Sequence, residues 1–159
     1  MDTYHLYEII ERRKSVRKFR MKPLNLHVLG EVSKMMEQLI PLRDHIQTEI
    51  VIASENAVKG LLSIRAPHYL LFFSEDKEDS LINAGFTLQQ MDLALSANGI
   101  GTCWLGLAKP KRNFKELSPL PFVIALAFGT PDESLHRAGK EAFNRYPLRD
   151  LSPRHQHEE

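Results

Sequence analysis

Apolar residues recur every three or four positions in three stretches of the chain, which is the spacing of one face of an α-helix. These stretches cover residues 3–13, about 25–39 and 79–99, and the last carries two apolar lines instead of one. Two lines predict a helix that is buried on most sides, against its own sheet and against a partner chain. We expect Asn25 to cap the second helix, and Gly99 to end the third in a left-handed conformation.

Continuous apolar runs elsewhere predict strands that are buried on both faces. The clearest runs are PHYLLFF at 67–73 and FVIALAFG at 122–129. Shorter runs predict strands at 49–53 and 102–107, and residues 56–62 are expected to form a short helix. This order of elements predicts an α+β or α/β sandwich with helices around one sheet.

The length of 159 residues favours a single domain, expected over residues 1–151, with a disordered tail at 152–159. No run of 18 apolar residues occurs, and no apolar run follows a basic start, so neither a spanning helix nor a signal peptide is expected. The single cysteine, Cys103, lies in an apolar segment and is expected to be a buried, inert thiol. We therefore expect a cytoplasmic protein with no membrane partner.

Basic residues are concentrated in the run RRKSVRKF at residues 12–19. Residues 11–22 hold seven basic side chains and one acid, whereas the whole chain has a net charge of +1. Such a local excess indicates a small anionic ligand more than a nucleic acid. Arg13, Ser15 and Arg17 alternate, so in an extended chain they would offer guanidinium and hydroxyl donors to a phosphate from one side. A solvated basic turn is the alternative interpretation.

The other patterns in the chain indicate no dinucleotide, metal or acid–base site. The segment Gly99-Ile100-Gly101 ends a predicted helix, whereas the glycine-rich loop of a dinucleotide site opens one. The seven histidines are scattered, and none lies at metal-ligand spacing from a cysteine or carboxylate, so no metal site is expected. No side chain stands out as a general acid or base, which leaves the catalytic residues unassigned.

Four segments occur in an order and spacing typical of a known family. They are RRKSVRKF, APHYLLFF from Ala66, Gly85 and Gln89 leading into GIGTCWLG from Gly99, and a strand ending in AFGTP at Pro131. Together, over about residues 5–131, they resemble the nitroreductase family of flavin enzymes. The resemblance implies an α+β sandwich with a central, mostly antiparallel sheet, a long buried central helix, and a homodimer that binds FMN at the subunit interface.

The resemblance also implies roles for individual residues of this chain. The group that would hold the FMN phosphate and ribityl chain comprises Arg13, Lys14, Ser15 and Arg17. A second segment matches one that lies near the flavin in some members, although core-strand positions are an equally good interpretation: Trp104, Leu105 and Gly106. Arg145, in RYPL, resembles a C-terminal basic residue of the family that also contacts the phosphate.

The activity that the resemblance implies is electron transfer through FMN. Members take a hydride from NAD(P)H onto the flavin and pass electrons to a nitroaromatic, a quinone or a similar small acceptor. No nucleic-acid partner is expected, because few aromatic residues interleave with the charges of residues 12–22, and a basic nucleic-acid-binding arm is only a distant alternative.

The chain departs from the family pattern between the second helix and the next strand. Many members carry A-P-S-x-x-N-x-Q-P-W there, where this chain reads PLRDHIQTEIVIASENAVKGLL. A branch of the family carries the A-P-S-x-x-N stretch in a later segment, so we expect a member that is shortened at its C-terminus. The departure leaves a second hypothesis open, in which a degenerate member keeps the dimeric fold, binds FMN weakly or not at all, and acts as a binding or structural module.

Overall fold

The computed structural model describes residues 3–60, 64–139, 142, 146 and 150, with side chains described from residue 7. Its centre is a four-stranded sheet with the strand order β1-β3-β6-β4, in which every neighbouring pair is antiparallel. This arrangement confirms the α+β class. The strands are β1 (Thr48–Ser54), β3 (His68–Ser74), β6 (Phe122–Gly129) and β4 (Gly101–Leu105).

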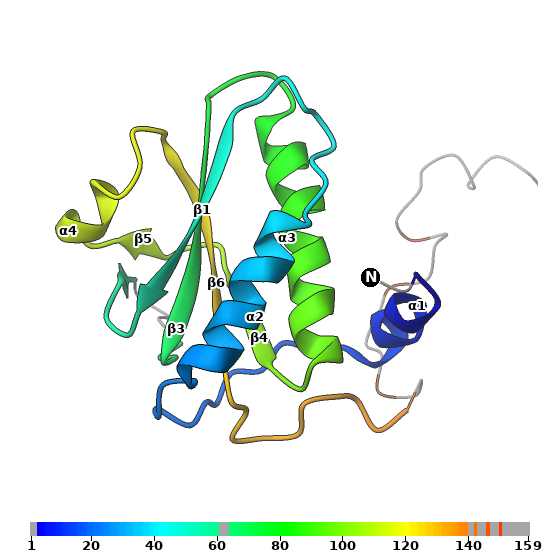
Figure 1. The fold of residues 1–159 in the computed structure, drawn as a ribbon. Coiled ribbons are helices and arrows are strands. Elements are labelled where there is room, and N and C mark those ends of the chain that lie inside the picture. Colours follow the sequence, from blue (N-terminus) through cyan, green and yellow to red (C-terminus); the bar gives the residue numbers. More distant parts are fainter. Residues whose placement is uncertain (1–2, 61–63, 140–141, 143–145, 147–149, 151–159) are drawn as a thin grey trace, which may run out of the picture.

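Two helices, α2 (Leu26–Glu37) and α3 (Ser80–Ala97), cover one face of this sheet (Figure 1). Side chains alternate between the two faces of a strand, so every second residue of β3 and β6 points toward these helices. The cluster on this face includes Leu70, Phe72, Phe128, Leu88 and Met91, all of them buried. The continuous apolar runs of β3 and β6 are explained by this layer together with a second one behind the sheet.

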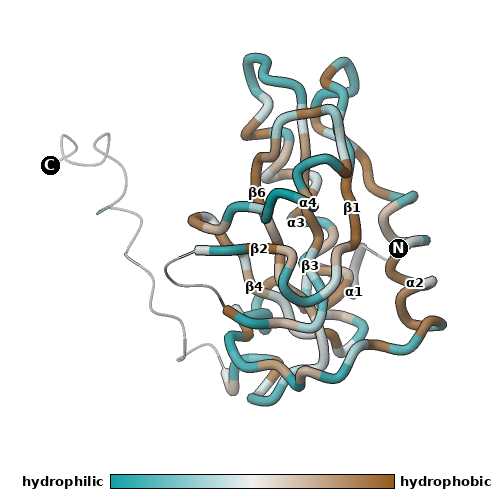
Figure 2. Tube along the Cα trace, turned by 90° about the vertical axis from the view of Figure 1, so that its left-hand side faces the viewer, coloured by the Kyte–Doolittle hydropathy of each residue, from teal (hydrophilic) through white to brown (hydrophobic). Residues whose placement is uncertain are grey.

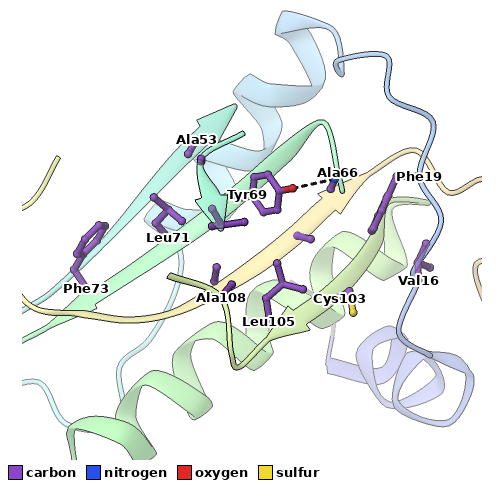
Figure 3. Close-up of a cluster of buried hydrophobic side chains, with 14 residues drawn as sticks. Val16, Phe19, Ala53, Ala66, Tyr69, Leu71, Phe73, Cys103, Leu105 and Ala108 are labelled. Atoms are coloured by element: carbon purple, nitrogen blue, oxygen red, sulfur yellow. Dashed lines mark hydrogen bonds between the residues drawn. The ribbon is translucent and has the colours of Figure 1, made fainter. Parts of the chain in front are cut away.

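The other face is covered by the small sheet of β2 (Val58–Lys59) and β5 (Lys109–Pro110) and by the short helix α4 (Arg112–Lys115). Figure 3 shows the cluster on this side, in which Leu71, Phe73 and Leu105 of the sheet are joined by Val16 and Phe19 of the N-terminal segment. Figure 2 shows hydrophobic residues along β1 and β6 and hydrophilic residues around α4. The outer position of α4 follows from this composition.

The long helix α3 has 18 residues, and ten of them are buried, which confirms the predicted buried central helix. It ends before Gly99, whose φ of +79° is the left-handed conformation expected there. The second apolar line is different, because Ile82 and Phe86 are 60% and 45% exposed in the single chain, and Leu81 at the start of the first line is 73% exposed. The helix α1 (Thr3–Arg12) packs against α3 and does not cover the sheet (Figure 1).

Other predicted boundaries are confirmed in part. Asn25 caps α2, and its side-chain oxygen accepts a hydrogen bond of 2.9 Å from the Val28 N–H. The helix predicted at 56–62 is wrong, because Asn56 adopts a left-handed turn with φ of +67° and Val58–Lys59 pairs with β5. Residues 61–63 and the predicted tail at 152–159 lie outside the described residues. Within the described part of the chain, no helix is both long and apolar enough to span a bilayer.

His68 links β3 to the segment that precedes α2. Its ring is buried and stacks on Phe128 with 5.3 Å between centroids, and its Nε2 accepts a hydrogen bond of 2.9 Å from the Leu24 N–H. A ring nitrogen that accepts a hydrogen bond carries no proton, so this contact requires neutral imidazole. Burial lowers the pKa of His68.

We expect the free energy of unfolding to fall as the pH drops below the ordinary histidine pKa of 6.5 and through the lowered pKa of His68. The unfolded chain binds the proton more readily, so His68 stabilises the fold above that pH and destabilises it below. Urea unfolding between about pH 5 and pH 8 measures this slope. His68→Gln should remove part of the slope, and His27→Gln, an exposed control, should leave it intact. Identical slopes in the wild type and His68→Gln would contradict the assignment.

Candidate functional site

The backbone of residues 13–20 is held between the edge strand β4 and the segment after β6. The Val16 N–H donates to the Thr102 carbonyl at 2.8 Å, and the Arg20 N–H donates to the Thr130 carbonyl at 3.0 Å. Val16 and Phe19 are buried in the core of Figure 3. A Cβ on Gly101 would lie 2.9 Å from a methyl carbon of Val16, so the loop packs directly against β4 and leaves no room for a side chain at position 101. The basic run is therefore a fixed part of the fold.

Ser15 and Arg17 lie at the junction of two cavities. The first, which we call the β4 cavity, has a volume of about 380 Å³ and is lined by Ser15, Arg17, Gly60, Ile64 and residues 103–108. The second, which we call the loop cavity, has a volume of about 410 Å³ and is lined by Lys14, Ser15, Arg17, Ala142 and residues 133–134 and 136–138. The two donors thus border concave surfaces, and their binding of a phosphate stays a prediction.

The structure brings the second predicted segment to the same place. Trp104, Leu105 and Gly106 all line the β4 cavity together with Ser15 and Arg17. Leu105 also belongs to the buried core beneath the cavity (Figure 3). The two interpretations of this segment, core strand and ligand wall, therefore describe the same residues.

Arg13 takes a different direction from Ser15 and Arg17. Its Nη1 lies 3.0 Å from Oδ2 of Asp92, a carboxylate that is fully buried. Arg13 is not among the residues that line either cavity. A direct contact between Arg13 and a phosphate stays a prediction, and the geometry gives this residue a structural role at the end of α1.

Asp92 is the residue of this region that the sequence analysis missed. Besides Arg13, it accepts hydrogen bonds from the Thr102 hydroxyl and from the Trp104 indole N–H, the latter at 3.0 Å. A carboxylate buried away from water requires such partners. The one signal in the sequence was a single acid among the apolar residues 91–95 of a helix predicted to be buried. Asp92 connects α1, α3 and β4, and it orients the Trp104 side chain.

Glu133 is a second missed residue, and it supports the loop from the outside. Its Oε1 accepts hydrogen bonds from the backbone N–H groups of Arg17 and Lys18, the latter at 2.9 Å. These backbone hydrogen bonds, with the nearby Lys14 ammonium, lower the pKa of Glu133. Lys14 Nζ lies 3.5 Å from Glu133 Oε2 and 2.9 Å from the Ser134 hydroxyl. Glu133 therefore binds the loop backbone and leaves the Arg17 side chain to the cavities.

Two further residues complete the account of the predicted site. Cys103 is buried as expected, and burial raises the pKa of its thiol, which disfavours the reactive thiolate. Arg145 lies outside the described residues, so its predicted contact with a phosphate stays a prediction. In the described part of the chain, no group of three histidine, cysteine, aspartate or glutamate side chains could hold a metal ion.

Comparison with known protein families identifies the fold. The family model described as "Putative TM nitroreductase" matches residues 5–159. The chain belongs to this nitroreductase family. No curated protein matches the chain in sequence.

Solved structures of nitroreductase-family proteins are similar to this chain over most of its length. A nitroreductase family protein from Clostridium difficile 630 has a TM-score of 0.70 and 15% identity, and covers 96% of this chain and 97% of its own. A nitroreductase with bound FMN from Desulfitobacterium hafniense DCB-2 has a TM-score of 0.64 and 14% identity, and the match covers 92% of this chain and 100% of that structure's chain. A "putative nitroreductase" from Thermotoga maritima MSB8 has a TM-score of 0.59 and 25% identity, and the match covers 91% of this chain and 54% of that structure's chain.

In this nitroreductase-family chain, we expect Asp92→Asn to lower the free energy of unfolding by about 2–4 kcal/mol. This is somewhat below the effect of breaking a fully buried ion pair, because the Arg13 side chain is partly exposed. The amide keeps the shape but leaves the Arg13 charge without its partner. Trp104 fluorescence should also shift, because its indole N–H loses a charged acceptor. Urea unfolding followed by fluorescence measures both effects.

The matched control for this change is Asp132→Asn, which breaks an exposed ion pair of 3.7 Å between Asp132 and Arg20. Such a pair contributes about 0–1 kcal/mol. Equal effects of the two substitutions would show that Asp92 does not hold the region together.

Proposed function

We propose that the chain is an FMN-dependent oxidoreductase that passes electrons from NAD(P)H to a nitroaromatic, a quinone or a similar small acceptor. The observation that carries the proposal is that Ser15 and Arg17 lie where a cavity with an apolar wall meets a polar one. FMN has the same division, with an anionic phosphate at one end and a flat aromatic ring at the other. Family membership and the relative with bound FMN support the proposal.

The residues present fit the phosphate end of FMN. Among the described residues, no carboxylate forms an ion pair with the Arg17 guanidinium, and Glu133 engages only the Arg17 backbone. An unpaired guanidinium beside a hydroxyl can donate charge-assisted hydrogen bonds, each worth roughly 1.5–3 kcal/mol. Lys14 also lines the loop cavity, where its positive charge is shared with the Glu133 carboxylate 3.5 Å away.

The residues that line the β4 cavity also fit the flavin ring of FMN. The β4 cavity is bounded by Ile64, Leu105, Leu107 and Ala108, whose side chains offer an apolar surface. When bound, FMN would supply the redox chemistry by accepting a hydride and releasing electrons to the acceptor. The chain would contribute binding, orientation of the ring against residues 104–106, and shielding from water.

We propose that two copies of the chain form a homodimer through α1 and α3. Exposed apolar side chains occur on both of these helices, which pack against each other: Tyr7, Ile10, Leu81, Ile82 and Phe86. Apolar side chains exposed in this number on adjacent elements favour an interaction site. The second apolar line of α3 would then be covered by the partner, as the sequence pattern indicates.

For the dimer, we expect a sedimentation experiment at micromolar concentration to show a dimer for the wild type and a monomer for Phe86→Glu, because a charge would be buried in an apolar interface. Leu26→Glu is the matched control, since Leu26 is 86% exposed but lies on α2. It should remain a dimer. A wild-type monomer, or dissociation of both variants alike, would contradict the assigned interface.

For the cofactor, we expect the purified protein to bind FMN with a flavin absorption spectrum that bleaches when NADH or NADPH is added. Arg17→Gln should weaken FMN binding by about tenfold or more, the effect of losing one charge-assisted hydrogen bond. Riboflavin has no phosphate, so its affinity should be the same for the wild type and Arg17→Gln. Lys18→Gln is the control, because Lys18 lines neither cavity.

Two results of this titration would contradict the proposal. A dissociation constant for FMN above about 10 µM, equivalent to roughly 7 kcal/mol of binding free energy, would favour the degenerate binding module. An equal loss of FMN and riboflavin affinity in Arg17→Gln would show that Arg17 does not contact the phosphate.

A further inference from the structure

A third cavity, which we call the basic cavity, adjoins the β4 cavity on the far side of Gly60. Its volume is about 300 Å³, and Gly60 lines both cavities. A Cβ on Gly60 would lie 3.2 Å from the Leu107 carbonyl oxygen, so a side chain is poorly accommodated at this boundary. At this boundary Gly60 itself adds no side chain, and the backbone of Leu107 and Ala108 lies against it.

The lining of the basic cavity carries an excess of positive charge. It contains three cations, Lys59, Arg65 and Lys111, and one carboxylate, Glu55. Among the described residues, no ion pair neutralises any of the three cations. Concave surfaces lined by one sign of charge concentrate ions of the opposite sign.

A fourth cation, Lys109, lies outside the lining of the cavity but next to one of its members. Lys59 lies directly opposite Lys109 in the β2–β5 pair. Like charges in directly opposite positions destabilise a pair of strands. The arrangement is therefore unfavourable for the fold alone, and an anion bound near it would relieve the repulsion.

The walls of the basic cavity are fixed by hydrogen bonds. The Lys111 N–H donates to the Ala57 carbonyl at 2.9 Å, and this bond ties β5 to the turn before β2. The Tyr69 hydroxyl donates to the Ile64 carbonyl at 3.2 Å. The same hydroxyl accepts from the Ala66 N–H at 3.0 Å (Figure 3). These bonds hold the backbone on both sides of Arg65, so the cations surround a formed cavity.

We propose that the basic cavity binds an oxyanion group, a phosphate or a carboxylate, of the substrate whose reactive part enters the β4 cavity. Lys59, Arg65 and Lys111 are the residues that recognise the anion, and Gly60 is the crossing point between the two parts of the substrate. The assignment of the reactive part rests on the proposed function, whereas anion binding itself does not. The chain therefore selects anionic redox substrates over neutral ones.

The first test is a calorimetric titration with inorganic pyrophosphate at low ionic strength, using the full-length protein with Arg17→Gln as the background. This background removes the proposed contact of Arg17 with the FMN phosphate at the junction of the β4 and loop cavities, so the effects of further substitutions report the basic cavity. Lys59→Gln and Arg65→Gln should each weaken pyrophosphate binding by about tenfold. Glu55→Gln should strengthen it, because the one carboxylate of the lining is removed.

The control for net charge is Lys34→Gln, since Lys34 lies on α2 across the sheet. It should leave pyrophosphate binding unchanged, and thermal melting of every variant checks that the fold is retained. Unchanged affinity in both Lys59→Gln and Arg65→Gln, or weaker binding in Glu55→Gln, would overturn the proposal. This outcome is independent of whether the protein binds FMN.

The second test identifies the source of the anion in the FMN-loaded protein. A fall of about tenfold in kcat/KM for NADPH in Lys59→Gln, with no change for a nitroaromatic acceptor, would place the phosphates of the donor in the cavity. A fall for 4-nitrobenzoate but not for nitrobenzene would place the carboxylate of an acceptor there. No change in any of these values would overturn the link between the basic cavity and the redox substrate.

Discussion

The ion pair between Arg13 and Asp92 determines where the basic run can lie. Asp92 is buried in α3, and a buried carboxylate is tolerated only when charged or polar partners surround it. Arg13, at the end of α1, and Trp104, on β4, both supply such partners. Because these contacts fix the start of the loop and the edge strand together, Ser15 and Arg17 emerge beside the wall formed by residues 103–108.

The basic side chains of residues 12–19 point in different directions, so some of them stabilise the fold and others line the cavities where a ligand can bind. Arg13 points inward to a carboxylate, and Glu133 occupies the backbone N–H groups of Arg17 and Lys18. The Arg17 side chain is left to face concave surfaces on both sides. A run that looks uniformly basic in the sequence thus contains structural cations and cations available to a ligand, distinguished only by their partners.

The main elements of the fold were predictable from the strongest apolar patterns, because long apolar runs such as 67–73 and 79–98 are buried whatever their neighbours are. The segment 56–62 was assigned wrongly because its structure depends on pairing with β5, about fifty residues later. Ser15, Arg17 and residues 104–106 were found through local motifs and the family resemblance. Asp92 and Glu133 were missed, since their roles depend on distant residues that a single sequence does not reveal.

The contact between Val16 and Gly101 makes the ligand-facing loop and the edge strand one rigid unit. The Val16 methyl groups fill the space that a side chain at position 101 would need, and the Val16 N–H is bonded to Thr102. A ligand that reaches Ser15 and Arg17 thus meets a preorganised surface, and the entropy of ordering the loop is lost during folding instead of binding. Any homologous chain with a larger residue at position 101 must therefore lift the loop from the strand and give up that advantage.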